Sequence, residues 1–296
     1  MKGSRLKAPG VFLLLLAAAA DGGALAPPVP SELRAKFEQQ VREIAGRVDG
    51  VVGYSIVDVT TGERIGHLER ATFPAASAIK LAIVYELFTQ AEEKQINLDE
   101  TMTLDRRQAV GGTGVLVEMG TPTLSIRDYA VLMVTLSDNT ATNVLIDKLG
   151  MDRIAARMQG LGLPGTKLRR HMMDTAAAQR GDENVSTPDE LARLLTVMNE
   201  KMPAAIELLK KPKENRLRKG LPEGVASADK SGELEGVRVD AGIVFAKNRP
   251  YVLSVMTTFL KDEAEGERAI EAISRAAFEH FSRLGLGGAL GRLNGR

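Results

Sequence analysis

Segments with a strand pattern lie near both ends of this chain, and the sequence between them has an almost entirely helical pattern. The strand candidates are short, β-branched and bounded by turn signals, and they cover residues 51–59, 64–68, 225–231, 238–246 and 251–258. A sheet has to bury an apolar face against another layer. We therefore expect strands from both ends of the chain to share one antiparallel sheet.

Amphipathic helices are expected at residues 31–48, with Ser31 as the N-cap, and at about residues 262–284. These helices would cover the sheet, and the helical middle would form a second domain inserted between the strands. The sequence predicts an α/β sandwich with a discontinuous α/β domain (residues 27–68 and 213–285), an all-helical domain (69–212) and a flexible tail (286–296). Clefts between such domains often hold small molecules.

The first 26 residues have the pattern of a signal peptide. Lys2, Arg5 and Lys7 precede an apolar run, and Ala24-Leu25-Ala26 matches a cleavage site, although Pro27 is unfavourable directly after it. The sequence therefore predicts export to the periplasm or secretion. An uncleaved membrane anchor is the alternative.

Composition excludes several classes of function. Without residues 1–26, the chain has one more acidic than basic residue, so nucleic acid is not an expected partner. There is no Cys, the three His residues are scattered, and no phosphate-binding loop is visible, so we expect no disulfide, metal or cofactor. We expect a monomer that acts on a small molecule or a cell-envelope polymer.

Ser77 and Lys80 form a candidate nucleophile and base at the start of an apolar helix. Positions i and i+3 share a helix face, so the hydroxyl and the amine can meet. A serine hydroxyl needs a base to remove its proton, and a lysine amine becomes that base when burial lowers its pKa. The same spacing at Ser4–Lys7 lies in the signal peptide, and Ser227–Lys230 lies on a strand, so Ser77–Lys80 is favoured.

Two more triplets accompany this pair. Ser137-Asp138-Asn139 falls between two predicted helices, and Lys230-Ser231-Gly232 ends a predicted strand. The simpler interpretations are a helix cap for the first triplet and an ordinary exit from a strand for the second.

Together the three motifs resemble the S-x-x-K, S-D-N and K-[ST]-G set of class A β-lactamases and their penicillin-binding relatives. The resemblance extends over about residues 31–285. It implies a five-stranded antiparallel sheet with flanking helices, joined to an all-helical domain.

The resemblance also implies roles for the motif residues. Ser77 would be acylated, Lys80 would be or assist the base, and Ser137 would relay a proton to the leaving nitrogen under the influence of Lys230. Asn139 and Ser231 would bind the amide and the carboxylate of the substrate. The backbone N–H groups of Ser77 and of Glu233, the residue after Gly232, would form the oxyanion hole.

The arginine that family members place near the substrate carboxylate has two candidates. On the strand after K-[ST]-G, its usual position holds Ala241. Another subset places it fourteen residues before the lysine, where this chain has Arg216. We therefore favour Arg216 over Arg238. The alternative is that Arg216 is a solvated residue of a basic loop.

The residue for deacylation is missing from the expected place. Class A β-lactamases activate the hydrolytic water with a Glu that falls here within residues 170–174, and no Glu stands there. Met172 or Met173 would fill the position, or Asp174 or His171 would act as a shorter or different base. The sequence thus predicts a penicillin-recognising serine hydrolase that cleaves β-lactam amides slowly. The alternatives are a D-alanyl-D-alanine carboxypeptidase acting on peptidoglycan peptide stems and a non-hydrolytic β-lactam sensor.

Overall fold

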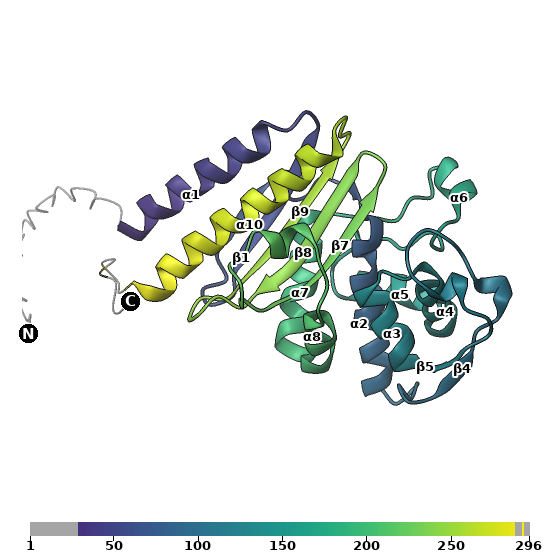
Figure 1. Cartoon of the computed structure of the whole chain (residues 1–296). Helices are drawn as coiled ribbons and strands as arrows, with labels where there is room; N and C mark the ends of the chain where they lie inside the picture. Colours follow the sequence, from purple (N-terminus) through teal and green to yellow (C-terminus); the bar gives the residue numbers. More distant parts are fainter. Residues whose placement is uncertain (1–28, 288–291, 293–296) are drawn as a thin grey trace, which may run out of the picture.

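Five strands from the two ends of the chain form one antiparallel sheet in the computed structural model, which describes residues 29–287 and 292 (Figure 1). The strands are β1 (Val51–Asp58), β2 (Arg64–His67), β7 (Ser227–Leu234), β8 (Val237–Val244) and β9 (Tyr251–Thr258). Their order is β2-β1-β9-β8-β7, and β1 pairs with β9 from Val51↔Thr258 to Asp58↔Tyr251. The predicted sharing of one sheet is confirmed.

Strand β7 differs from the expectation for its end. It continues to Leu234, so Lys230-Ser231-Gly232 lies within the strand and not at its exit. Its pairing with β8 runs to Leu234↔Val237 and is closed by Glu235 and Gly236 alone. Gly236 has a φ of +66°, a conformation that glycine adopts without strain. The sequence pattern does not reveal this two-residue turn, so the expected strand ends three residues before the observed one.

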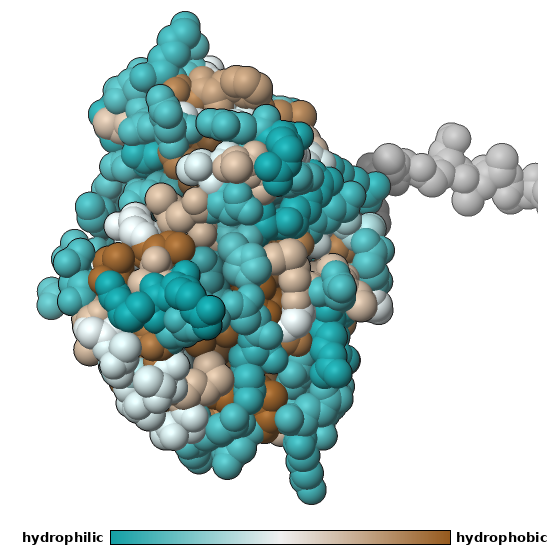
Figure 2. Space-filling model, turned by 90° about the vertical axis from the view of Figure 1, so that its right-hand side faces the viewer, coloured by the Kyte–Doolittle hydropathy of each residue, from teal (hydrophilic) through white to brown (hydrophobic). Residues whose placement is uncertain are grey.

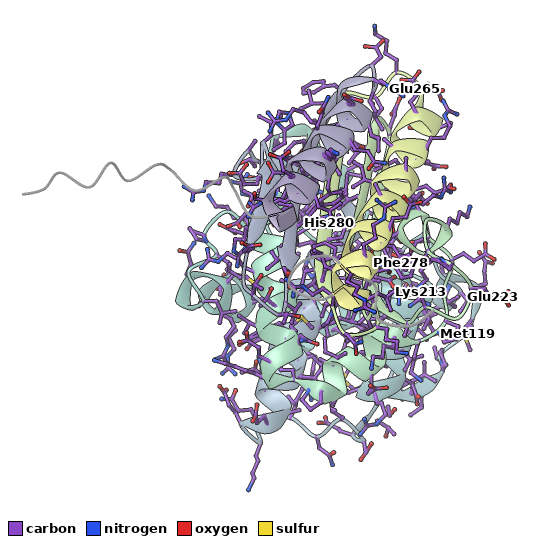
Figure 3. The ribbon with its side chains drawn as sticks, turned by 90° about the vertical axis from the view of Figure 1, so that its left-hand side faces the viewer. Met119, Lys213, Glu223, Glu265, Phe278 and His280 are labelled. Atoms are coloured by element: carbon purple, nitrogen blue, oxygen red, sulfur yellow. The ribbon has the colours of Figure 1, made fainter. Side chains whose placement is uncertain are left out.

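Helices α1 (Val29–Gly46) and α10 (Glu263–Leu286) lie side by side on one face of the sheet (Figures 1 and 3). His280 of α10 stacks on Phe37 of α1, with 4.2 Å between ring centroids. Because α1 begins at Val29, Ser31 lies inside the first turn, and the prediction that it is the N-cap is wrong. No helix among the described residues is long and apolar enough to span a membrane.

The other face of the sheet is covered by α7 (Pro188–Lys201) and α8 (Pro203–Lys210). One apolar cluster joins Val239 and Ile243 of the sheet, Leu191 and Leu195 of α7, and Leu81 of α2 (Lys80–Glu92). The division into two domains stays a prediction. Helices α7 and α8, which it placed in the helical domain, pack against the sheet.

Helix α2, whose apolar side chains are almost all buried, is packed against α3 (Ile126–Thr135), α4 (Asn139–Leu149) and α5 (Met151–Gly160). Helix α9 (Arg216–Lys219) packs instead against α10 and β8. The remaining elements are helix α6 (Thr175–Gln179), the 3₁₀ turns η1 (Ala76–Ile79), η2 (Arg106–Gln108) and η3 (Leu116–Glu118), and the strand pairs β3 (Phe73–Pro74) with β6 (Val185–Ser186) and β4 (Thr101–Thr103) with β5 (Thr123–Ser125). The β3–β6 pair ties the loop before α7 to the segment that leads into η1. The predicted signal peptide lies outside the described residues, as does the predicted tail except for residues 286, 287 and 292.

Candidate active site

The three sequence motifs meet at one cleft of about 540 Å³. Its walls include Ser77, Ser137, Asn139, Ser231 and Gly232. The face of the molecule on the side of α3, α4 and α5 is mostly hydrophilic, with apolar side chains in small separate patches (Figure 2). The hydroxyls of Ser77 and Ser231 make no hydrogen bond with the described residues. Both are therefore open to a ligand.

Ser77 lies on a 3₁₀ turn and not, as expected, on the α-helix itself. The turn η1 runs directly into α2 at Lys80, and residues i and i+3 eclipse one another in a 3₁₀ helix. Ser77 and Lys80 therefore still share a face. The residue before the serine, Ala76, has a φ of +46°, a strained conformation for alanine. Periodicity alone could not reveal this strain.

Lys80 is fully buried and connects two of the motifs. Its Nζ donates to the Ser137 carbonyl oxygen (2.7 Å), to Ser137 Oγ (2.9 Å) and to Asn139 Oδ1 (3.2 Å). Burial, and then the charge of Lys230, hold the pKa of Lys80 well below its usual value. A lysine whose pKa is lowered in this way gives up its proton more readily and can then act as a base. Its hydrogen bonds go to Ser137 and Asn139, and none goes to Ser77.

Asp138 builds the turn between α3 and α4. Its Oδ1 caps α4 by accepting from the Ala141 amide (2.8 Å), and its Oδ2 accepts from the amides of Val115 (2.6 Å) and Leu116 (2.9 Å). Ser137, with a φ of +52°, is thereby presented to the cleft. The interpretation of this triplet as a helix cap is confirmed for Asp138, and its neighbours Ser137 and Asn139 line the cleft.

The loop before η3 forms another wall of the cleft. Thr113 donates to the Ser137 carbonyl oxygen (2.7 Å), and its own carbonyl accepts from the Asn139 amide (3.0 Å). Gly112 lies so close that a Cβ there would be 2.6 Å from Asn139 Nδ2. Thr113 therefore helps to position Ser137, a role that sequence reasoning missed.

Strand β7 approaches the nucleophile closely at Gly232. A Cβ on this residue would lie 2.6 Å from the Ser77 amide nitrogen, so only glycine allows β7 and η1 to meet. Two residues earlier in the strand, Lys230 is buried and donates to the Ser231 carbonyl oxygen (2.6 Å). Burial, and then the charge of Lys213, lower the pKa of Lys230 to about 8. The nucleophile, the buried lysines and the strand backbone thus share one small space.

A pocket of about 380 Å³ adjoins the cleft and shares Thr113, Ser137, Ser231 and Glu233 with it. We call it the cationic pocket because its walls include four basic side chains, Lys213, Arg216, Lys219 and Lys230, against three acidic ones, Glu214, Glu233 and Glu267. Arg238 is not a wall residue. It is held by Glu263 and Glu267, each at 2.9 Å. The geometry therefore favours Arg216 over Arg238 as the ligand of a substrate carboxylate.

The loop expected to carry the deacylating residue places two methionines at the cleft. Asn143 fixes the backbone of Met172 by accepting from its amide (2.8 Å) and donating to its carbonyl (3.1 Å), and the Met172 side chain lines the cleft. Met173, with a φ of +65°, lines it as well. Asp174 instead caps α6 through the Ala177 amide (2.9 Å).

Two further residues clarify this loop. His171 pairs with Asp147 (2.8 Å) and is not a wall residue of the cleft. Glu183, which sequence reasoning missed, does line the cleft but is paired with Arg170 (2.7 Å). Glu183 reaches the cleft only because the loop folds back, and no local sequence motif indicates this position. Among the described residues, no group of three or more His, Asp or Glu is placed to hold a metal ion.

Comparison with known proteins decides the family. The model of the beta-lactamase enzyme family matches residues 36–281. The chain belongs to this family. It is 28% identical to a beta-lactamase of Streptomyces fradiae, over 90% of this chain and 92% of that protein.

Solved structures of the family resemble the fold closely. A beta-lactamase from Sphaerobacter thermophilus superposes with a TM-score of 0.74 at 28% identity, covering 83% of this chain and 96% of the other. PBP-A superposes with a TM-score of 0.76 at 27% identity and the same coverage. A mutant of PBP-A is known as its acyl-enzyme complex with penicillin G. The chain is thus a class A beta-lactamase-like protein, and the implied fold is confirmed.

Proposed function

We propose that this protein is a penicillin-recognising serine hydrolase that forms an acyl-enzyme at Ser77 and releases it slowly. The observation that carries the proposal is the geometry of Lys80, a buried amine of lowered pKa that shares a helical face with Ser77 and is hydrogen-bonded to Ser137. Class A beta-lactamase-like membership supports the serine-hydrolase chemistry. The pattern of residues 1–26 supports export.

The acylation step follows from these positions. Ser77 Oγ attacks the amide carbonyl carbon, and its proton passes to Lys80 Nζ. The backbone N–H groups of Ser77 and Glu233 stabilise the oxyanion. As the C–N bond breaks, the leaving nitrogen takes a proton from Ser137 Oγ, which regains one from Lys80. The side chain of Lys80 is then neutral again.

A D-alanyl-D-alanine carboxypeptidase is the second candidate function, because slow hydrolysis of a penicillin acyl-enzyme is typical of such enzymes. The cleft wall carries Met172 where a water-activating carboxylate would be expected, and PBP-A is among the similar structures. A D-alanyl-D-alanine carboxypeptidase would use the same acylation machinery on peptidoglycan peptide stems. The test below separates slow from fast release.

Mixing the protein with benzylpenicillin should add the mass of the intact drug to the peptide containing Ser77, because opening the ring loses no atoms. We expect the adduct to persist for minutes or longer by intact-protein mass spectrometry, digestion to locate it on the Ser77 peptide, and Ser77→Ala to remain unmodified. Rapid loss with hydrolysed drug in solution would instead indicate an efficient β-lactamase. The absence of any adduct would refute the proposal.

The rate of acylation should depend on pH through two lysines. It should rise as Lys80 loses its proton, and it should fall as pH passes about 8, where Lys230 loses the charge that attracts the substrate carboxylate. Lys213, Arg216, Asp229 and Asp240 also act on Lys230, so the alkaline limb reports the whole group. Acylation rates from pH 5 to 10 would show the profile. In Lys230→Arg the alkaline limb should move upward, and an unmoved limb would assign it elsewhere.

A further inference from the structure

Glu233 lies where the cleft meets the cationic pocket and is a wall residue of both. Its Oε2 is 3.0 Å from Arg216 Nη2. Residues i and i+2 of a strand point to the same face, so the side chains of Ser231 and Glu233 share one face of β7. The carboxylate of Glu233 therefore lies among the groups that the proposed function assigns to the carboxylate of the substrate.

Arg216 has no other acceptor among the described residues. Its side chain is 12% exposed and makes one hydrogen bond with the described residues, the one to Glu233, and its Nε is buried without a partner. A guanidinium binds a carboxylate best through two parallel N–H donors. In the ligand-free protein, the guanidinium that should receive a substrate carboxylate is thus already bound to a side chain of the protein itself.

The contact can be broken at low cost. The Glu233 side chain is 57% exposed, and ion pairs at such exposed positions are weak. The same Oε2 is 4.0 Å from Arg238 Nε, which offers a second cation when Arg216 is taken. Glu233 can therefore leave Arg216 without losing all electrostatic support.

We propose that Glu233 is a specificity-determining residue that occupies the carboxylate subsite and has to be displaced by a substrate carboxylate. The inference rests on the proposed function and deepens it. A substrate with a free carboxylate beside its scissile amide competes with this tethered anion, whereas one with an uncharged group there does not. Glu233 therefore reduces the advantage that a free carboxylate has at this site over an uncharged group, such as an ester or an amide.

The test compares benzylpenicillin with its methyl ester, which lacks the free carboxylate, as acylating agents of Ser77. In Glu233→Gln, the second-order acylation constant for benzylpenicillin should rise about three- to tenfold, through tighter binding and not through a faster chemical step. The constant for the ester should stay within about twofold. Glu235→Gln removes the same charge at the tip of the same hairpin, where Glu235 has no ion pair with the described residues, and is the matched control.

A second variant tests the route of the effect. In an Arg216→Gln background, Glu233→Gln should no longer improve acylation by benzylpenicillin, because the guanidinium for which Glu233 and the penicillin carboxylate compete has been removed. An unchanged or lower ratio of the two acylation constants in Glu233→Gln would overturn the inference. An equal rise for penicillin and ester would overturn it too, since the effect would then lie in the β7 backbone. If neither compound acylates the unmodified protein, the proposed function itself fails.

Discussion

Replacing Lys80 by methionine should slow acylation of Ser77 about a thousandfold, because general acid–base groups contribute about 10² to 10⁴ in rate. Lys80 is the buried amine of lowered pKa that shares a face with Ser77, and it also holds Ser137, which protonates the leaving nitrogen. Methionine matches the length of the lysine side chain, but it can neither accept the proton of Ser77 nor donate one to Ser137. The measurement is the single-turnover rate of adduct formation with benzylpenicillin.

Two comparisons make this result interpretable. Lys148→Met removes an amine from α4 that pairs with Glu100, and it should acylate at the normal rate. Lys80→Met should also keep a cooperative thermal transition, at a lower midpoint, because it leaves the Ser137 carbonyl oxygen and Asn139 Oδ1 without this donor. A folded Lys80→Met protein that acylates normally would show that another group is the base.

Introducing a carboxylate at position 172 should accelerate deacylation about a hundredfold or more, again within the range of a general base. Asn143 already fixes the backbone of Met172, and the side chain lines the cleft. A glutamate there can accept a proton from a water beside the acyl-enzyme, which methionine cannot do. The lifetime of the Ser77 adduct after removal of excess penicillin measures the effect.

The control for Met172→Glu is Met172→Gln, which has the same shape and no basic oxygen of comparable strength. The glutamine variant should keep the long lifetime. Met173→Glu places the charge one residue further on, where the side chain is 45% exposed, and should give a smaller gain. An adduct of Met172→Glu that lasts as long as that of the unmodified protein would show that the water cannot be activated from this loop.

Much of the fold could be predicted because its signals are local. Strand β9 has the bounds that its β-branched pattern indicates, and the motif residues Ser77, Ser137, Asn139 and Ser231 all reach one cleft. The errors lie where local pattern and tertiary packing differ. The end of β7 depends on a two-residue turn, and η1 lies so close to β7 that only a glycine fits at position 232.

The pairings between distant residues could not be predicted. Glu183 reaches Arg170, and Glu233 reaches Arg216, only after loops and strands have been folded together. Charge and spacing in the sequence do not say which of several acidic residues a given arginine meets. The burial of Lys80 and Lys230, which lowers their pKa values, likewise follows from tertiary packing, in which η1 at the start of α2 meets β7.

The apolar cluster that joins the sheet to α2 and α7 bears on how the protein folds and moves. Separating the two parts would expose Val239 and Ile243 on one side and Leu81 and Leu191 on the other. Exposure of that much apolar surface opposes a hinge motion and couples the two parts in unfolding. Although the chain order suggests two domains, we expect this shared cluster to make the two parts unfold together. Adaptation to different substrates would then fall to exposed side chains at the rim of the cleft, such as that of Met173.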